Sequence, residues 1–298
     1  MYDVTIVGAG PAGLSAALSL GRMRRRVLVC DTGAGRNAAS HAAHNIFTRD
    51  GTPPAELRRI GREQLRPYTT VEVRDTGIER ASLSAQGFDL TLSDGTTLAS
   101  KRLLLASGVV DLLPAVEGLS NFWGRGVYTC PYCDGWEHRD QPIAAYAPPP
   151  AVAHVVSLLT LLSGNVTLFT DGPASLSREE RTRLAVRGII LREERVLRVE
   201  GDGGVLAAIV LAGGENVPCR ALFVKTEQHQ HSTLPQQLGC TLNEQGFVAV
   251  DAQGRTSVPG VSAAGDMTKM MQQVIVAAAD GAIAAAAINF DLLAGDTH

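Results

Sequence analysis

The chain has 298 residues, of which 45% are apolar and 19% are charged, and its formal net charge at pH 7 is −3. This length allows two domains of ordinary size, and this composition is typical of a globular protein. The weak negative charge argues against the basic surface that a nucleic-acid-binding protein normally carries.

The N-terminal residues predict a strand, a glycine-rich turn and a helix. Met1-Tyr2 leads directly into the β-rich run Val4–Val7, with no charged region or cleavage site of a signal peptide. The turn Gly8–Gly13, with the sequence GAGPAG, follows, and then an Ala/Leu-rich helix that we expect to end near Leu20. This order matches the fingerprint of a dinucleotide-binding fold.

The residues of this turn have separate roles in such a fold. Gly8 makes the tight turn, Gly10 lets the backbone approach a pyrophosphate, and Gly13 allows the helix to pack closely on the strand. The helix N-terminus offers free N–H groups and the positive end of its dipole to the phosphates. We therefore count Pro11 and Ala12, at the start of this helix, among the cofactor-binding residues with the three glycines.

A second strand is predicted over Arg26–Cys30 and ends at Asp31. An acidic residue in this place accepts hydrogen bonds from the ribose of a bound dinucleotide. The first site therefore predicts a dinucleotide ligand, but it does not by itself distinguish FAD from NAD.

Two later segments favour FAD. Leu103–Gly108 resembles the "ATG" strand and turn of flavoproteins with two dinucleotide-binding domains, and Val258–Asp266 resembles their "pGvfAaGD" segment. The resemblance places Ala106, Gly108, Gly265 and Asp266 at the cofactor and implies that Asp266 holds the ribityl and pyrophosphate region of FAD. It also implies that the next helix directs its N-terminus at the flavin, where a positive dipole stabilises the reduced anion.

Tyr128–Trp136, with the sequence YTCPYCDGW, contains two cysteines separated by two residues, Cys130 and Cys133. Such a pair can close a small disulfide at a helix N-terminus, where the thiolate is stabilised. The same spacing is half of a zinc site, but the sequence has no second CxxC and no His-x₃₋₅-His pair to complete four ligands. We predict a redox-active pair and no metal; a zinc site and an inert pair are the alternatives.

The order of these motifs resembles that of low-molecular-weight thioredoxin reductases over nearly the whole chain. The resemblance implies that Cys133 lies against the flavin, that Cys130 attacks the substrate disulfide, and that Asp134 donates and accepts the proton of the thiol chemistry. Thiol–disulfide exchange needs one attacking thiolate and one protonated leaving group, which suits these roles.

Four further residues are assigned to the cofactor by the same resemblance. Gln272-Gln273-Val274 resembles the family's "RQA" segment, with a one-residue deletion after Asp266 and without the Arg; Gln273 and Val274 are carried over. Asn45 falls where the family has an Asn close to the flavin. Arg36 lies in the loop that family members fold over the cofactor.

The second nucleotide site of that family is altered. After the expected strand Pro142–Tyr146, the sequence reads Ala147-Pro148-Pro149-Pro150-Ala151, where the family has glycines. Proline has no N–H group and adds bulk where backbone must approach a pyrophosphate. The strand Asn165–Phe169 then leads to Asp171, which would repel the 2′-phosphate of NADPH. We expect this domain to have lost nicotinamide binding, and we read the polar stretch Lys225–His231 as a substrate or electron-donor face or as a solvated loop.

The predicted fold is α/β, with two Rossmann-like domains as in flavoproteins that bind two dinucleotides. We expect a discontinuous FAD domain formed by residues 1–117 and 248–298, and an NADPH-domain-like region at 118–247 that carries the CxxC pair. Asp280 and Gly281 interrupt the Ala-rich stretch near the C-terminus, so we expect no membrane span. Five cysteines, an odd number, favour a reducing, cytoplasmic setting over a secreted disulfide scaffold.

The favoured function is an FAD-dependent thiol–disulfide oxidoreductase that does not use NADPH. Reduction of an external disulfide would need electrons from ferredoxin or from a second flavin, and the protein or small-molecule partner could be thioredoxin. The alternative is a dithiol oxidase that passes electrons to oxygen, and a second alternative is a flavin-binding redox sensor without turnover. Nucleic acid and membrane are not expected partners, and the family resemblance implies a homodimer.

Overall fold

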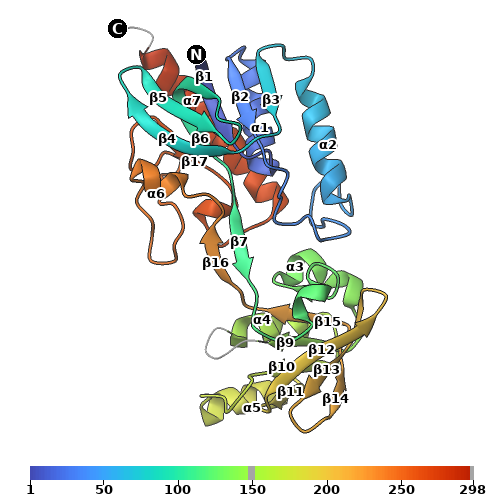
Figure 1. Ribbon diagram of the computed structural model, residues 1–298. Helices are drawn as coiled ribbons and strands as arrows, with labels where there is room; N and C mark the ends of the chain where they lie inside the picture. Colours follow the sequence, from blue (N-terminus) through green and yellow to red (C-terminus); the bar gives the residue numbers. More distant parts are fainter. Residues whose placement is uncertain (147–151, 296–298) are drawn as a thin grey trace. The chain divides into compact units, whose positions relative to one another are not determined.

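A computed structural model describes residues 1–146 and 152–295, and the chain divides into two compact units (Figure 1). Unit 1 contains Met1–Ala38, Asn45–Val110 and Gln228–His298, and unit 2 contains Ala39–His44 and Asp111–Glu227.

These divisions differ from the boundaries expected from the sequence, which assigned residues 118–247 to the second domain. Residues 228–247 belong to unit 1 because their apolar side chains are buried in its core. Helix α6 (Leu234–Leu238) and Phe247 pack in the same cluster as Phe88 and Leu90. Residues 111–117, expected in the FAD domain, belong to unit 2.

Unit 1 is built on a seven-stranded sheet. Its strands are β1 (Tyr2–Val7), β2 (Val27–Cys30), β3 (Val71–Arg74), β4 (Ile78–Ser84), β5 (Gly87–Leu92), β6 (Thr97–Leu105) and β17 (Val261–Ala263). The order is β3-β2-β1-β6-β5-β4, with β17 also paired to β6. The β3-β2-β1-β6 pairs and the β17–β6 pair are parallel, whereas β4 and β5 add an antiparallel meander. The run Val27–Cys30 is fully buried, as expected for a strand covered on both faces.

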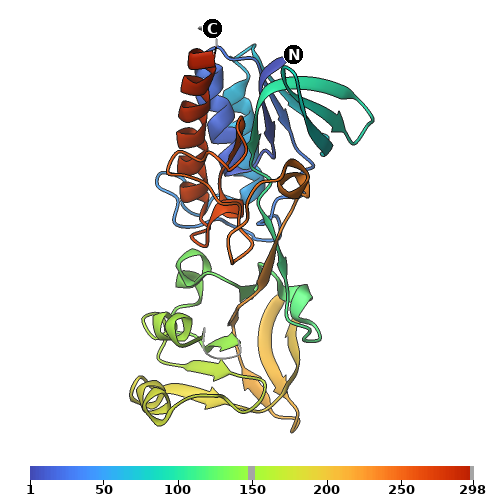
Figure 2. The ribbon, with the colours of Figure 1, turned by 90° about the vertical axis from the view of Figure 1, so that its left-hand side faces the viewer.

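Two helices pack closely in the core of unit 1 (Figure 2). These are α1 (Pro11–Arg22) and α7 (Val274–Gly295), and α2 (Pro54–Leu65) is the third long helix of the unit. The contact between α1 and α7 depends on Gly281, because a Cβ there would lie 2.0 Å from the carbonyl oxygen of Ala12. Small residues on both helices therefore let the two backbones approach each other.

Helix α7 is also long and apolar enough to cross a membrane by length and composition, with 33% of its most apolar window buried. The sequence predicts an interruption at Asp280 and Gly281, but the helix continues through both residues. Lys269 pairs with the Asp280 carboxylate at 2.7 Å, and Gly281 packs on α1. Core helices pass the same length and hydropathy test, and α7 contributes Ala277, Ala284 and Ile288 to the core of unit 1.

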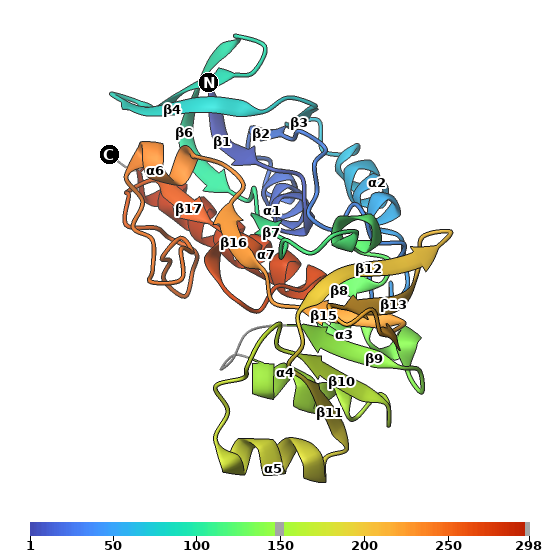
Figure 3. The same ribbon diagram turned by 60° about the horizontal axis from the view of Figure 1, so that its bottom comes forward.

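Unit 2 contains a five-stranded parallel sheet and a three-stranded antiparallel sheet (Figure 3). The parallel strands are β8 (Val127–Tyr128), β9 (Ile143–Tyr146), β10 (Val166–Phe169), β11 (Ile189–Arg192) and β15 (Ala221–Val224). The antiparallel strands are β12 (Val196–Asp202), β13 (Val205–Leu211) and β14 (Asn216–Pro218), and the helices are α3 (Pro131–Asp134), α4 (Val152–Leu159) and α5 (Arg178–Val186).

The two sheets share part of their strand arrangement. In unit 2 the order is β11-β10-β9-β15-β8, so β9 lies between β10 and the later strand β15, as β1 lies between β2 and the later strand β6 in unit 1. This arrangement is typical of a Rossmann fold, in which ligands bind at the carboxyl ends of the strands where the order reverses. The predicted α/β class with two Rossmann-like domains is confirmed.

The chain passes between the units through β7 (Val109–Leu112) and β16 (Glu227–Gln230), which pair in a two-stranded sheet. Strand β16 occupies most of the polar stretch at 225–231, which is therefore not a loop.

Candidate functional site

The glycine-rich turn of unit 1 requires glycine at two positions for packing. Gly8 has φ +104°, and a Cβ there would lie 2.5 Å from the carbonyl oxygen of Ala106. A Cβ at Gly13 would lie 1.9 Å from the carbonyl oxygen of Gly8. The turn between β1 and α1 therefore has no room for a side chain at Gly8 or Gly13, and at Gly8 it packs against Ala106, which follows β6.

Gly10 is different, because a Cβ there would have no atom of the described chain within 4 Å. It is the N-cap residue of α1, makes no side-chain cap, and is followed by Pro11 at the first helical position. The N–H groups of the first helical turn, including those of Ala12 and Gly13, have no partners within the helix. An open space facing these donors fits a pyrophosphate group, so the residues present suit the expected dinucleotide.

Asp31 lies just beyond β2, and its carboxylate already has two partners. Oδ1 accepts a 3.1 Å hydrogen bond from the backbone N–H of Ala9, and Oδ2 accepts one of 2.9 Å from Arg62. Arg62 also pairs with Asp75 at 2.7 Å. A carboxylate can accept about four hydrogen bonds, so Asp31 retains capacity for ribose hydroxyls.

Arg36 and Asp266 are far apart in the sequence but lie together in unit 1. The Nη1 atom of Arg36 donates to Asp266 Oδ2 at 3.0 Å and to Gln272 Oε1 at 2.7 Å. Gly265, with φ +81°, precedes the 3₁₀ helix Asp266–Thr268. The structure thus brings Arg36, predicted to lie in the loop over the cofactor, into contact with Asp266, predicted to bind the cofactor.

The other residues predicted to contact the cofactor lie at turns or at a helix start. The N–H of Ala106 donates to the carbonyl of Val7 at 2.9 Å, and Gly108 has φ +72°. Val274 is the first residue of α7, and the carbonyl of Gln273 accepts from Ala277 at 2.9 Å. Asn45 has φ +59°, and its N–H donates to Asp50 at 2.6 Å.

In unit 2, Cys130 and Cys133 form a disulfide with a Cα–Cα distance of 5.3 Å. Cys130 is the N-cap residue of α3, and Cys133 lies one turn later on the same side. Gly135 closes the segment, since a Cβ there would lie 2.4 Å from the carbonyl oxygen of Pro131. The three remaining cysteines, Cys30, Cys219 and Cys240, are free and buried.

The carboxyl group of Asp134 has a pKa that is raised into the neutral range. Burial, followed by the nearby charge of Glu137, raises the pKa of Asp134 to about 7, and His44 acts in the opposite direction. His44 itself lies 3.5 Å from Glu137, measured from Nε2 to Oε1. A group with a pKa near 7 can both donate and accept a proton at physiological pH.

A second titratable pair lies in the same unit. The Nε2 atom of His138 and the hydroxyl of Tyr128 are 3.1 Å apart, and their rings are in contact with a centroid distance of 5.4 Å. Burial lowers the pKa of His138, and burial together with the charges of Asp134 and Glu137 raises the pKa of Tyr128. No sequence pattern indicates roles for His44, Glu137 and Tyr128, because their spacing matches no motif.

The predicted second nucleotide site is described only in part. Residues 147–151, which contain the three prolines, lie outside the described residues. Asp171, the other residue of the predicted site, follows β10 with φ +54°. Its Oδ2 accepts a 2.9 Å hydrogen bond from the Tyr146 hydroxyl, and its Oδ1 accepts one of 2.7 Å from the N–H of Val196. Asp171 thus has a structural role in unit 2.

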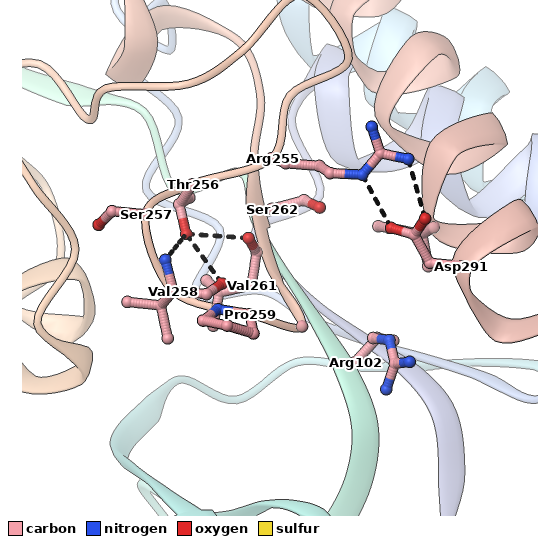
Figure 4. A pocket seen from close by; sticks show the side chains of 11 residues that line it. Arg102, Arg255, Thr256, Ser257, Val258, Pro259, Val261, Ser262 and Asp291 are labelled. Carbon is pink, nitrogen blue, oxygen red and sulfur yellow. Dashed lines mark hydrogen bonds and ion pairs between the residues drawn. The ribbon is translucent and has the colours of Figure 1, made fainter. Parts of the chain in front are cut away.

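A pocket in unit 1 lies apart from these residues (Figure 4). It is lined by the loop around Val258, by Arg102 on β6 and by Asp291 on α7. Arg255 donates to both oxygens of Asp291, at 2.9 and 2.8 Å, and so ties this loop to the helix. None of the predicted cofactor-binding residues lines it.

The sequence matches the pyridine nucleotide-disulphide oxidoreductase family over residues 2–281. It is 31% identical to thioredoxin reductase sirT of Leptosphaeria maculans, over 99% of this chain and 96% of that protein. It is 31% identical to thioredoxin reductase tcpT of Claviceps purpurea, over 99% and 95%. The structure resembles that of an oxidoreductase from Agrobacterium tumefaciens with a TM-score of 0.93 and 32% identity, over 98% of both chains.

Proposed function

Since the chain belongs to the pyridine nucleotide-disulphide oxidoreductase family, we propose that it exchanges electrons between FAD and the Cys130–Cys133 pair without NADPH. Membership makes the protein a flavin-dependent disulfide oxidoreductase of the thioredoxin-reductase-like kind, and it implies FAD as the cofactor. Beyond family membership, we propose that NADPH is not the electron donor, and we propose a redox partner and a direction of electron transfer below.

The residues assigned to FAD lie in unit 1, at the glycine-rich turn Gly8–Gly13, at Asp31 and in the segment that carries Asp266. The open N-terminus of α1 at Gly10 would receive the pyrophosphate, Asp31 the ribose, and Asp266 the ribityl region. When bound, the flavin supplies a two-electron redox centre.

The thiol chemistry falls to unit 2. In the oxidising direction, one substrate thiolate attacks the Sγ atom of Cys130, the Cys130–Cys133 bond breaks, and Cys133 leaves as a thiolate. The second substrate thiol then displaces Cys130, so that the substrate becomes a disulfide and the protein a dithiol. Asp134 is suited to hold or release the accompanying proton, since its pKa is about 7. Disulfide reduction is the reverse sequence.

The observation that carries the NADPH proposal is the sequence that follows β9. Pro148, Pro149 and Pro150 stand where the family resemblance leads us to expect glycines, and three prolines offer no backbone N–H donors to a pyrophosphate. The carboxylate of Asp171, held in place by the Tyr146 hydroxyl and the Val196 N–H, supports the same interpretation, because its negative charge would repel the 2′-phosphate of NADPH.

Without a nicotinamide, the direction of the reaction depends on the second partner. Reduction of thioredoxin or another disulfide, as the names of the relatives suggest, requires electrons from ferredoxin or a second flavin. Oxidation of a dithiol requires only dioxygen, which takes up two electrons and two protons to form hydrogen peroxide. The loss of the usual donor site therefore favours the dithiol oxidase as the second candidate function.

A homodimer is part of the proposal. Helix α7 exposes Ile275, Ile283, Phe290 and Leu293 at 42 to 68%, and their spacing places them on one side of the helix. A second copy of the chain would cover this apolar face. Light scattering should give a dimer for the wild type and a monomer for Phe290→Asp, whereas binding of the monomer to vesicles would favour a membrane instead.

We also place the protein in the cytoplasm, since Cys30, Cys219 and Cys240 are free.

The direct test of direction uses two assays on the FAD-loaded protein. Oxygen uptake on adding a dithiol supports the oxidase, and reduction of thioredoxin by photoreduced enzyme supports the reductase. The absence of turnover in both assays would contradict the exchange function. The NADPH claim is tested by anaerobic mixing with NADPH, which should leave the flavin oxidised.

A further inference from the structure

Strand β16 directs two glutamines toward the segment that carries Asp266. Gln228 and Gln230 are half-buried, whereas Glu227 and His229 are exposed, which is the alternation of a strand with one covered face. Both glutamines and the segment 266–274 belong to unit 1.

Gln228 forms a reciprocal amide pair with Gln272. Its Nε2 donates to Gln272 Oε1 at 2.9 Å, and its Oε1 accepts from Gln272 Nε2 at 2.9 Å. The same Gln272 Nε2 donates to the carbonyl of Asp266 at 3.1 Å, and the same Oε1 accepts from Arg36 at 2.7 Å. Gln228 therefore fixes the orientation of a side chain that contacts both members of the Arg36–Asp266 ion pair.

Gln230, two residues after Gln228 on β16, binds the same segment at Met267. Its Nε2 donates to the carbonyl of Met267 at 3.1 Å and to that of Gly246 at 2.8 Å. Its Oε1 is buried and has no hydrogen-bond partner in the described part of the chain. An acceptor left unpaired costs free energy, so the two bonds from Nε2 must compensate for it.

We propose that Gln228 is a positioning residue for the flavin site. Through its amide pair with Gln272, it holds Arg36, Asp266 and the start of α7 in the arrangement that receives FAD. Gln228 touches neither reacting sulfur, and its effect passes through Gln272. The inference rests on FAD binding, which family membership implies, and it is independent of whether NADPH reduces the flavin.

The test is Gln228→Leu, which keeps a side chain of similar bulk and removes both amide hydrogen bonds. Two lost hydrogen bonds at the site predict FAD binding that is weaker by about tenfold. FAD is removed from the purified holoenzyme and titrated back, and the visible circular dichroism of the bound flavin is compared with that of the wild type. The flavin signature should change, because the groups around it lose their fixed orientation.

Gln237→Leu is the matched control. Gln237 is also a glutamine of unit 1 whose amide makes two hydrogen bonds to another segment, since it donates to the carbonyl of Glu79 at 2.9 Å and accepts from the N–H of Ala81 at 3.3 Å. This variant should lose stability similarly but retain the FAD affinity and the flavin signature. Equal loss of FAD in both variants would show a merely structural role and overturn the proposal.

A double-mutant comparison identifies the route. In a Gln272→Leu background, Gln228→Leu should weaken FAD binding by less than about twofold further, because the pair is already broken. An undiminished effect in that background, or wild-type FAD affinity in Gln228→Leu itself, would overturn the proposal.

Discussion

The hydroxyl of Tyr146, the last residue of β9, donates a 2.9 Å hydrogen bond to Oδ2 of Asp171, which follows the neighbouring strand β10. Burial, and then this hydrogen bond, raise the pKa of Tyr146 to about 12, so the phenol remains a donor at physiological pH. The other carboxylate oxygen accepts from the N–H of Val196 on β12. Asp171 therefore joins three strands of unit 2.

Replacement of Asp171 by alanine tests this structural role. The variant leaves the Tyr146 hydroxyl and the Val196 N–H without their acceptor, so it should lower the free energy of unfolding by about 1–2 kcal/mol. Turnover with dithiol or disulfide substrates should be unchanged, as measured by steady-state kinetics beside a denaturant melt. A large rise in KM for a nicotinamide, with unchanged stability, would contradict the structural interpretation.

Substitution of either cysteine of the disulfide should stop the reaction without loss of the cofactor. Cys130→Ser and Cys133→Ser each remove one sulfur of the exchange pair, and turnover should fall by at least about 100-fold. The ratio of flavin to protein absorbance should match that of the wild type. Cys240→Ala, at a buried free cysteine, is the control and should retain activity. Normal turnover in both serine variants would refute the redox pair.

The pH dependence of turnover should report Asp134. Its pKa is raised to about 7 by burial and by Glu137, so the carboxyl is neutral below this pH and charged above it. As a base in dithiol oxidation, it predicts that kcat/KM rises as the pH passes through about 7. Asp134→Asn should remove this step and slow turnover by about 100-fold.

Glu137→Gln should move the same step to lower pH, because it removes the negative charge that disfavours the Asp134 anion. The control is Glu194→Gln, which removes a carboxylate in unit 2 that is paired with Arg192. Glu194→Gln should leave the midpoint of the pH profile of kcat/KM unchanged. A profile that Glu137→Gln leaves unshifted would contradict the assignment of Asp134.

The same pKa implies a dependence of stability on pH. Because folding raises the pKa of Asp134, protonation favours the folded state. The stability from this group is complete below about pH 4 and is lost as the pH rises through about 7. Thermal melts between pH 4 and 8 should show a wild-type decline that is smaller in Asp134→Asn.

Gly10 and Gly13, both in the glycine-rich turn of unit 1, should respond differently to added side chains. Gly10→Val places methyl groups in space that is open in the protein, so folding should be preserved while FAD is lost. Gly13→Ala instead brings a Cβ to 1.9 Å from the Gly8 carbonyl oxygen, so it should destabilise the fold by several kcal/mol, on the order of 3. FAD titration and melting of both variants check the difference. Retention of tightly bound FAD by Gly10→Val would exclude this turn as the pyrophosphate site.

Local sequence patterns are sufficient to predict the features that depend only on residues close together in the chain. The strand–turn–helix around Gly8 follows from glycine placement, and the Cys130–Cys133 disulfide is possible because residues three apart lie on one side of a helical turn. Both are determined within a few residues, so no knowledge of the topology was needed.

Contacts between distant segments could not be predicted in this way. The Arg36–Asp266 pair joins residues 230 positions apart, and the Gln228–Gln272 pair joins residues 44 apart. Which residues meet depends on how β16 and the segment after β17 are brought together. The domain boundary differed for a related reason, since apolar residues such as Leu234 and Phe247 do not indicate which of two cores they enter.

The measurement that tests the central claim most directly is anaerobic mixing of the FAD-loaded protein with excess NADPH, followed by the flavin absorbance. Dithiothreitol is the positive control, since it should reduce the flavin through the Cys130–Cys133 pair in the wild type but not in Cys133→Ser. The account predicts that the flavin stays oxidised with NADPH while dithiothreitol bleaches it. Rapid bleaching by NADPH would contradict it.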